Sequence, residues 1–192
     1  MILLVDLAHT PDSLSRDEFV GPVARIVART GETWRTMHFS AVSSADLRDA
    51  GGIILCGTAL MDNGFAGRPG EFSWLSDAPA PVLGICAGMQ ALCLAYGGTL
   101  RGECEIGMTG VRVTQADPLL GEARSFEAYE LHSFACSPPP GWLVTAVSDR
   151  CIQAVRHPDL PLFGVMFHPE VRNDAVVERF CGLCRNQSSC KR

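Results

Sequence analysis

A cysteine flanked by small residues is the strongest candidate for a catalytic residue in this 192-residue sequence. The nucleophile-elbow pattern, G-x-nucleophile-x-G, matches Gly84-Ile85-Cys86-Ala87-Gly88, between an apolar run and a stretch of helical periodicity. Small residues allow the sharp turn that would present the Cys86 sulfur, and the N-terminal end of the following helix favours its thiolate form. The amide of Ala87 would be placed to stabilise an oxyanion. A buried structural cysteine is the alternative interpretation of the pentapeptide alone.

A histidine and a carboxylate lie close together near the end of the sequence, in Phe167-His168-Pro169-Glu170. Pro169 favours an extended conformation for His168, and residues two apart in an extended chain point to the same side. Glu170 can therefore orient the His168 ring, as the carboxylate of a catalytic triad does. A lone histidine before proline is more often a surface residue. However, Cys86 and His168 both end predicted parallel strands, where ligands bind in open α/β sheets.

Strands and helices alternate in the elements that would position these groups. Strands are predicted at 2–5, 34–39, 52–56, 81–85 and 161–167, of which those at 2–5, 81–85 and 161–167 are expected to be buried, and helices at 44–50 and 88–96. A capping box at 15–18 predicts a further helix that Gly31 closes, with Pro22 marking a kink or a later start. Asn173 is expected to cap the last helix. This order predicts an α/β fold with a doubly wound, mostly parallel sheet of the flavodoxin-like type.

The segment from Gly98 to Ala154 has a different pattern. It contains short predicted strands at 111–113, 125–131 and 143–147, separated by turn signals and without a helix. We expect a small antiparallel extension of the sheet here. Because linkers and repeats are absent, we expect one domain over residues 1–192.

Composition narrows the possible functions. The net charge is −5 and no long run of Lys or Arg occurs, so a nucleic-acid binder is not expected. No apolar stretch approaches the ~20 residues that cross a bilayer. The N-terminal segment 1–6 has neither the charged leader nor the cleavage site of a signal peptide. We therefore expect no membrane association and a cytoplasmic location.

The nine cysteines are scattered and odd in number, which favours reduced thiols over a disulfide framework. Cys181 and Cys184, with Cys190 behind them, could suggest a metal site. Their spacing relative to Val177 and Phe180 is helical, so we favour burial on a helix face and keep zinc as the alternative. No second CxxC or His pair completes a tetrahedral set, and we expect neither a metal nor a cofactor.

The two motifs together resemble those of the class I (triad) glutamine amidotransferases, and the resemblance covers essentially the whole chain. GICAGMQ at 84–90 is similar to the family's G-[IV]-C-x-G-x-Q, and FHPE at 167–170 to its terminal H-P-E. The resemblance implies that Cys86 attacks the carboxamide of L-glutamine. His168 would protonate the leaving ammonia and then activate water against the thioester, while Glu170 orients its ring. The Ala87 amide would form half of the oxyanion hole.

The resemblance also implies substrate contacts. Gln90 matches the family's substrate-contacting glutamine. The stretch 129–134 resembles a later strand of the family, where the backbone of His132, Ser133 and Phe134 would help to hold glutamine; a strand with a surface histidine is the alternative.

The turn that would donate the second oxyanion amide departs from the family's S-G-G-P or S-P-G-P. Here Gly57 is followed by Thr58, which takes glycine dihedrals badly. The turn is therefore expected to be rearranged, or to become ordered when a partner docks.

Nothing in the chain resembles a nucleotide-binding loop of the form GxxxxGK[ST]. We therefore expect ammonia to pass to a separate synthetase chain of the ATP-pyrophosphatase type, as in two-subunit GMP synthases. The sequence E-I-G at 105–107 is similar to the E-I-G of several GMP-synthase-like proteins. The alternatives are the glutaminase component of an anthranilate or aminodeoxychorismate synthase, a self-contained γ-glutamyl or peptide thiol hydrolase, and a non-catalytic module that has kept the fold.

Overall fold

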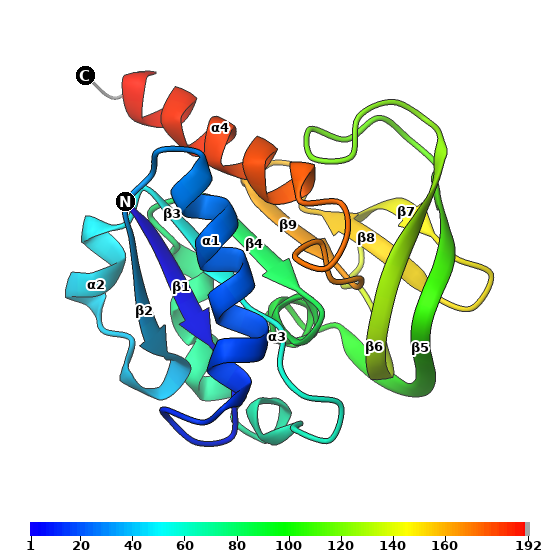
Figure 1. Cartoon of the computed structure of the whole chain (residues 1–192), viewed down its shortest axis with the longest axis horizontal. Coiled ribbons are helices and arrows are strands. Elements are labelled where there is room, and N and C mark those ends of the chain that lie inside the picture. Colours follow the sequence, from blue (N-terminus) through cyan, green and yellow to red (C-terminus); the bar gives the residue numbers. More distant parts are fainter. Residues whose placement is uncertain (191–192) are drawn as a thin grey trace.

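One continuous sheet organises the computed structural model, which describes the backbone of residues 1–190 and the side chains of residues 1–187. Over these residues the sheet has nine strands in the order β2-β1-β3-β4-β9-β8-β7-β5-β6 (Figure 1). The strands are β1 Ile2–Asp6, β2 Trp34–His38, β3 Gly52–Leu55, β4 Val82–Ile85, β5 Thr99–Val113, β6 Ser125–Ser137, β7 Leu143–Val147, β8 Ile152–Arg156 and β9 Leu162–Val165. The pairs among β2, β1, β3, β4 and β9 are parallel, and the remaining pairs are antiparallel. This confirms the predicted α/β fold with an antiparallel extension.

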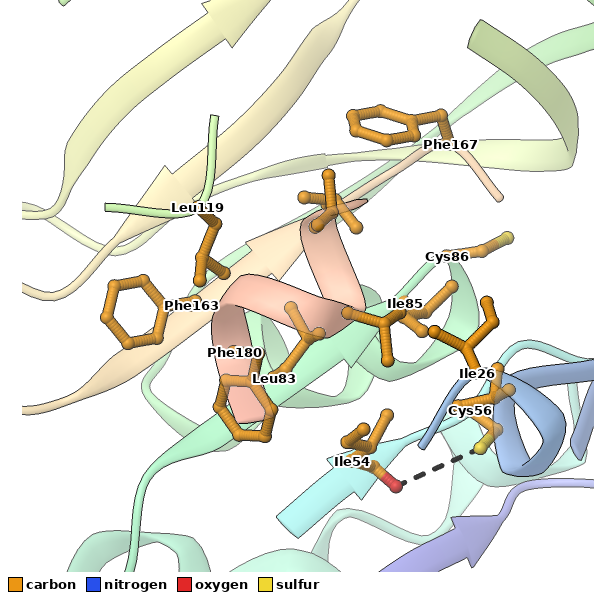
Figure 2. Packing of buried hydrophobic residues seen from close by; sticks show 14 of the residues in the cluster. Ile26, Ile54, Cys56, Leu83, Ile85, Cys86, Leu119, Phe163, Phe167 and Phe180 are labelled. Atoms are coloured by element: carbon orange, nitrogen blue, oxygen red, sulfur yellow. Dashed lines mark hydrogen bonds between the residues drawn. The ribbon is translucent and has the colours of Figure 1, made fainter. Parts of the chain in front are cut away.

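Helices cover both faces of the parallel part, which explains why β1, β3, β4 and β9 are apolar without alternation, whereas the edge strand β2 is partly exposed. On β1, Ile2 and Leu4 pack with α1 (Gly21–Arg29) and α4 (Ala175–Cys190). Leu3 and Val5 face the other side, where α2 (Ser44–Asp49), the 3₁₀ helix Pro69–Asp77 and α3 (Ala87–Ala95) lie. Figure 2 shows the first of these two cores, with Phe180 of α4 near Leu83 of β4.

Helix starts differ from the sequence prediction at two places. The capping box predicted at 15–18 is wrong, because Ser15 has helical dihedrals and no side-chain cap, and residues 16–20 form a π-helical turn. The α-helix starts later, at Gly21, with Pro22 in its first turn, where its missing N–H costs nothing. The predicted cap at Asn173 is also wrong: α4 begins at Ala175, and the Asn173 amide donates to the Glu127 carbonyl at 2.9 Å.

The antiparallel extension is larger than expected. The short strands predicted at 111–113 and 125–131 are parts of β5 and β6, 15 and 13 residues long, which form a hairpin. Glycines at 102, 107 and 110, and an irregularity between Gly102 and Glu105, interrupt the alternation that would have revealed β5. Strand β8 was not predicted as a separate element.

Cys181 and Cys184 are buried in the core between α4 and the sheet, which confirms the core interpretation for these two residues. The side chain of Cys190 lies outside the described residues. Among the helices that the structure describes, none has the length and apolar character to span a bilayer.

Candidate active site

A sharp turn carries Cys86 between β4 and α3. Its backbone φ of 49° and ψ of −106° lie in a region that non-glycine residues rarely adopt. Such strain is typical of a nucleophile at a strand-to-helix elbow. Figure 2 shows Cys86 just beyond Ile85, at the carboxyl end of β4. The elbow predicted from the sequence is therefore present.

The two glycines of the elbow are required for close approach rather than for unusual dihedrals. A Cβ on Gly84 would lie 2.5 Å from the Gly88 carbonyl carbon, and a Cβ on Gly88 would collide with the Leu55 carbonyl. Neither glycine has a positive φ. Helix α3 therefore begins directly against β3 and β4. The first amides of α3, starting with that of Ala87, have no partner within the helix.

His168 follows β9 and is held on several sides. Its backbone N–H donates to the Tyr129 carbonyl at 2.8 Å, and its Nδ1 lies 2.7 Å from Oε1 of Glu170. The ring centroid is 5.6 Å from that of Phe19. Because Nδ1–H donates to the carboxylate, Nε2 is left to react, and among the described residues it has no hydrogen-bond partner. The prediction that Glu170 lies on the same side as His168 is confirmed.

The charges around His168 favour the imidazolium. Burial of the ring opposes a positive charge, but the neighbouring Cys86 and Glu170 side chains outweigh it, so the pKa of His168 rises well above its ordinary value of 6.5. His168 is therefore suited to donate a proton beside the nucleophile.

The turn after β3 is ordered without glycine dihedrals at Thr58. Thr58 does not have a positive φ, as a turn rearranged to accept threonine requires. Its side chain is buried, and Oγ1 donates to Asp62 at 3.0 Å. Gly57 is needed for a different reason: a Cβ there would lie 2.7 Å from Cε1 of His168.

A very small cavity adjoins Cys86, with a volume of about 10 Å³. Its lining combines six of the predicted site residues with five others: Thr58, Cys86, Ala87, Gln90, His132 and Ser133, with Ala59, Leu60, Asp62, Asn63 and Leu131. A volume of 10–15 Å³ is about what one water needs, so the space beside Cys86 is narrow in this conformation. Gly57, Phe134, His168 and Glu170 do not line the cavity.

The predicted substrate contacts are hydrogen-bonded within the protein in this conformation. Gln90 donates from Nε2 to the Phe134 carbonyl at 2.7 Å, and Ser133 donates from Oγ to the Leu60 carbonyl at 3.2 Å. His132 is 2% exposed, so the surface-histidine alternative is wrong. Its ring also approaches Glu105 in a buried group with ligand chemistry that is separate from Cys86.

Sequence reasoning missed the parts of the site that tertiary packing contributes. Asp62 receives hydrogen bonds from Thr58 and from the His9 amide, and Phe19 packs on His168. Phe19 looked like any apolar helix residue, and Asp62 lies outside every motif. No pattern in the sequence marked either position.

Known proteins share these features. The family model described as glutamine amidotransferase class-I matches residues 23–178. A subunit of the glutamine-hydrolysing GMP synthase of Methanocaldococcus jannaschii is 37% identical over 117 residues, 56% of this chain and 62% of the relative. The corresponding protein of Pyrococcus abyssi is 30% identical over 172 residues, 79% of this chain and 90% of the relative.

A solved structure from Thermoplasma acidophilum, provisionally named as one subunit of a GMP synthase, has the same fold. Its TM-score is 0.85 at 23% identity, and the match covers 99% of this chain and 96% of the other. The family match extends over most of the sequence and includes both the elbow and His168. The chain belongs to the class I glutamine amidotransferase family of enzymes.

Proposed function

We propose that this chain hydrolyses L-glutamine to glutamate and ammonia through a thioester on Cys86, and that the ammonia passes to a separate synthetase. The observation that carries the proposal is the convergence of three groups at the carboxyl ends of β4 and β9. A strained Cys86 at the start of α3 interacts with His168, and Glu170 fixes the ring of His168 at 2.7 Å.

In the first half-reaction the Cys86 thiolate attacks the carboxamide carbon of glutamine, and the C=O electron pair moves to oxygen. The Ala87 amide at the start of α3 is placed to stabilise this oxyanion, with an amide of Gly57 or Thr58 as the second donor. The carbon–nitrogen bond then breaks. His168 gives its proton to the departing nitrogen, so that ammonia leaves and a γ-glutamyl thioester remains.

In the second half-reaction His168 is neutral and takes a proton from water as the water attacks the thioester carbon. The carbon–sulfur bond breaks, glutamate leaves and the thiolate–imidazolium pair is restored. Glu170 keeps Nε2 directed at the reacting atoms throughout, because it accepts a hydrogen bond from Nδ1–H.

The nature of the partner is inferred from the relatives and from the cavity. The relatives are named as subunits of glutamine-hydrolysing GMP synthases, and the chain contains no nucleotide-binding loop of its own. We therefore propose an ATP-pyrophosphatase type synthetase of the GMP-synthase kind. The small volume of the cavity beside Cys86 supports a glutaminase that is reshaped when its partner binds.

Ammonia release from glutamine by wild type, Cys86→Ser and Cys104→Ser tests the chemistry. Cys104 is exposed, so its substitution is a matched control for the loss of a thiol. Cys86→Ser should release no measurable ammonia and should not form a covalent adduct with an electrophilic glutamine analogue, whereas Cys104→Ser should behave like wild type. Ammonia release by Cys86→Ser at the wild-type rate would show that the thioester mechanism is wrong.

A further inference from the structure

A buried group of ligand-type side chains lies in the antiparallel extension, beside the proposed active site. Glu105 comes from β5, Glu130 and His132 from β6, and Cys151 from the residue before β8. All four are buried, with Glu130 0% exposed and Cys151, the most accessible, 7%. The proposed hydrolysis uses none of their side chains.

The reactive atoms of this group are close together. Nε2 of His132 lies 3.5 Å from Oε2 of Glu105 and 3.3 Å from Oε2 of Glu130. Sγ of Cys151 lies 3.0 Å from Oε2 of Glu105. The ligand atoms of Glu105, His132 and Cys151 are all within 4.8 Å of one another. In a tetrahedral zinc site with bonds of about 2.0–2.3 Å, neighbouring ligand atoms lie roughly 3.3–3.8 Å apart. Glu105, His132 and Cys151 therefore need only small shifts to surround one cation, and Glu130 adjoins them through His132.

The orientation of His132 is already that of a metal ligand. Its Nδ1 lies 3.1 Å from the Glu103 carbonyl, which can only accept, so Nδ1 carries the proton. The lone pair is then on Nε2, the atom that faces the two carboxylates. A hydrogen bond from the second ring nitrogen to a carbonyl is the usual way in which proteins orient a ligating histidine.

Several polar atoms in the group lack partners. Neither carboxylate oxygen of Glu130 has a hydrogen bond within the described residues, and the same holds for Nε2 of His132. Burying a carboxylate without compensation is costly, and a cation between these atoms would remove the cost. Glu130 and His132 are both more than nine-tenths buried and are directed into the group.

We propose that Glu105, Glu130, His132 and Cys151 form a structural binding site for a divalent cation of the zinc class. A thiol and an imidazole beside carboxylates favour zinc over magnesium or calcium, which prefer oxygen ligands throughout. Four protein ligands leave no open position, as in structural zinc sites. The Cys151 thiol loses its proton to solvent as the sulfur–zinc bond forms.

The position of the site suggests what the cation does. It would join β5, β6 and the chain just before β8, three segments whose ligands are far apart in the sequence. His132 also lines the small cavity beside Cys86. The cation would therefore fix the wall of the glutamine pocket without touching the substrate.

The test must separate this site from the proposed triad, because Cys86, His168 and Glu170 are a second set of zinc-ligand types. All measurements therefore use the Cys86→Ser background, in protein purified without a metal-affinity tag. Zinc content is measured directly, and Co²⁺ is added to the metal-free protein to detect thiolate-to-cobalt absorption. The variants in this background are Cys151→Ser, Glu130→Gln and, as a surface control, Cys104→Ser.

We expect one equivalent of zinc in Cys86→Ser and in its Cys104→Ser control, together with thiolate–cobalt absorption. Loss of a residue that hydrogen-bonds to a metal ligand typically weakens metal binding 10–100-fold. Loss of the ligand itself in Cys151→Ser should therefore weaken zinc binding by at least about 100-fold and abolish the thiolate–cobalt absorption. Zinc should raise the melting temperature of the Cys86→Ser protein but not that of its Cys151→Ser derivative. Glu130→Gln, which preserves side-chain size, should also weaken zinc binding if the fourth ligand is correct.

A folded Cys86→Ser protein that binds neither zinc nor cobalt would overturn the proposal. Equal binding by the Cys86→Ser protein and its Cys151→Ser derivative would overturn it as well, since the metal would then lie elsewhere.

Discussion

Gly57→Ala offers a sharp test of the proposed site, because the change adds one methyl group beside the catalytic base. The new Cβ would lie 2.7 Å from Cε1 of His168, whereas ordinary contacts begin near 3.4 Å. The ring must therefore move by about 0.7 Å, or the turn that carries Gly57 must move by the same amount. Phe19 on one side and Glu170 on the other leave the ring little freedom.

The size of the effect follows from this geometry. A shift of the ring away from Glu170 would stretch the 2.7 Å hydrogen bond beyond the normal range of about 2.7–3.2 Å. A misplacement of about 1 Å near reacting atoms can cost 10²-fold in rate. We therefore expect kcat to fall by about 10- to 100-fold, which corresponds to roughly 1.4–2.7 kcal/mol of transition-state stabilisation.

The assay is steady-state ammonia release, with thermal unfolding measured alongside to show that the variant is folded. Gly70→Ala is the matched control, since a Cβ at Gly70 meets nothing within 4 Å and its φ is not positive. The control should keep the wild-type kcat. A folded Gly57→Ala protein with unchanged kcat would refute the placement of His168, and an equal loss in Gly70→Ala would refute the steric argument.

His168→Asn should lower glutamine hydrolysis by about 10²–10⁴-fold, because proton transfer is lost, and Glu170→Gln should lower it less, because a misoriented imidazole still samples the productive pose; a slower Glu170→Gln enzyme contradicts this order. Because the pKa of His168 is raised, the imidazolium persists as the pH rises past 6.5, so kcat/KM should decline only well above that pH. The decline should begin at lower pH in Glu170→Gln, which lacks one of the charges that raise this pKa, and a pH–rate profile that is the same for both enzymes would exclude this role. The ATP-pyrophosphatase component of a GMP synthase, with its nucleotide substrate, should raise ammonia release about 10²–10³-fold, because a missing oxyanion donor costs a glutaminase that much in rate. Full activity without any partner would instead favour the self-contained hydrolase. Activation by a chorismate-using synthase would favour the alternative acceptor.

The parallel core and the positions of Cys86 and His168 could be predicted because they depend on local patterns. Strands that are buried on both faces are apolar throughout, so β1, β3, β4 and β9 are visible in the sequence. Parallel strands place their carboxyl ends at one edge, which brings the residues after β4 and β9 together. The pairing of His168 with Glu170 needed only the two-residue period of an extended chain.

The remaining features depend on distant contacts. The need for glycine at position 57 comes from a histidine more than a hundred residues away, and dihedral reasoning about Thr58 could not reveal it. The sequence separation of Glu105, His132 and Cys151 does not match a metal-binding motif, because three separate strand regions supply these residues. In β5 and β6 the partly exposed faces carry mixed residues, so hydrophobic alternation could not define the ends of these strands.

Strand β6 links the antiparallel extension to the chemistry, because it is the last strand in the sheet order and, within the described part of the chain, pairs only with β5. Backbone groups on the outer edge of such a strand are available to other parts of the chain. The Tyr129 carbonyl accepts from the His168 amide at 2.8 Å, and the Leu131 carbonyl lies 3.6 Å from the Cys86 sulfur. One strand edge thus contacts both the base and the nucleophile.

The register of β6 therefore decides whether the site is assembled. Side chains alternate along a strand, so a slip of one residue would exchange Glu130 and His132 with their neighbours and would also displace the carbonyls of Tyr129 and Leu131. The buried group opposes such a slip, since His132 meets Glu105 of β5 only in the observed pairing. A cation bound there would lock that pairing. The conformation of the nucleophile and base would then depend on groups that take no part in the reaction.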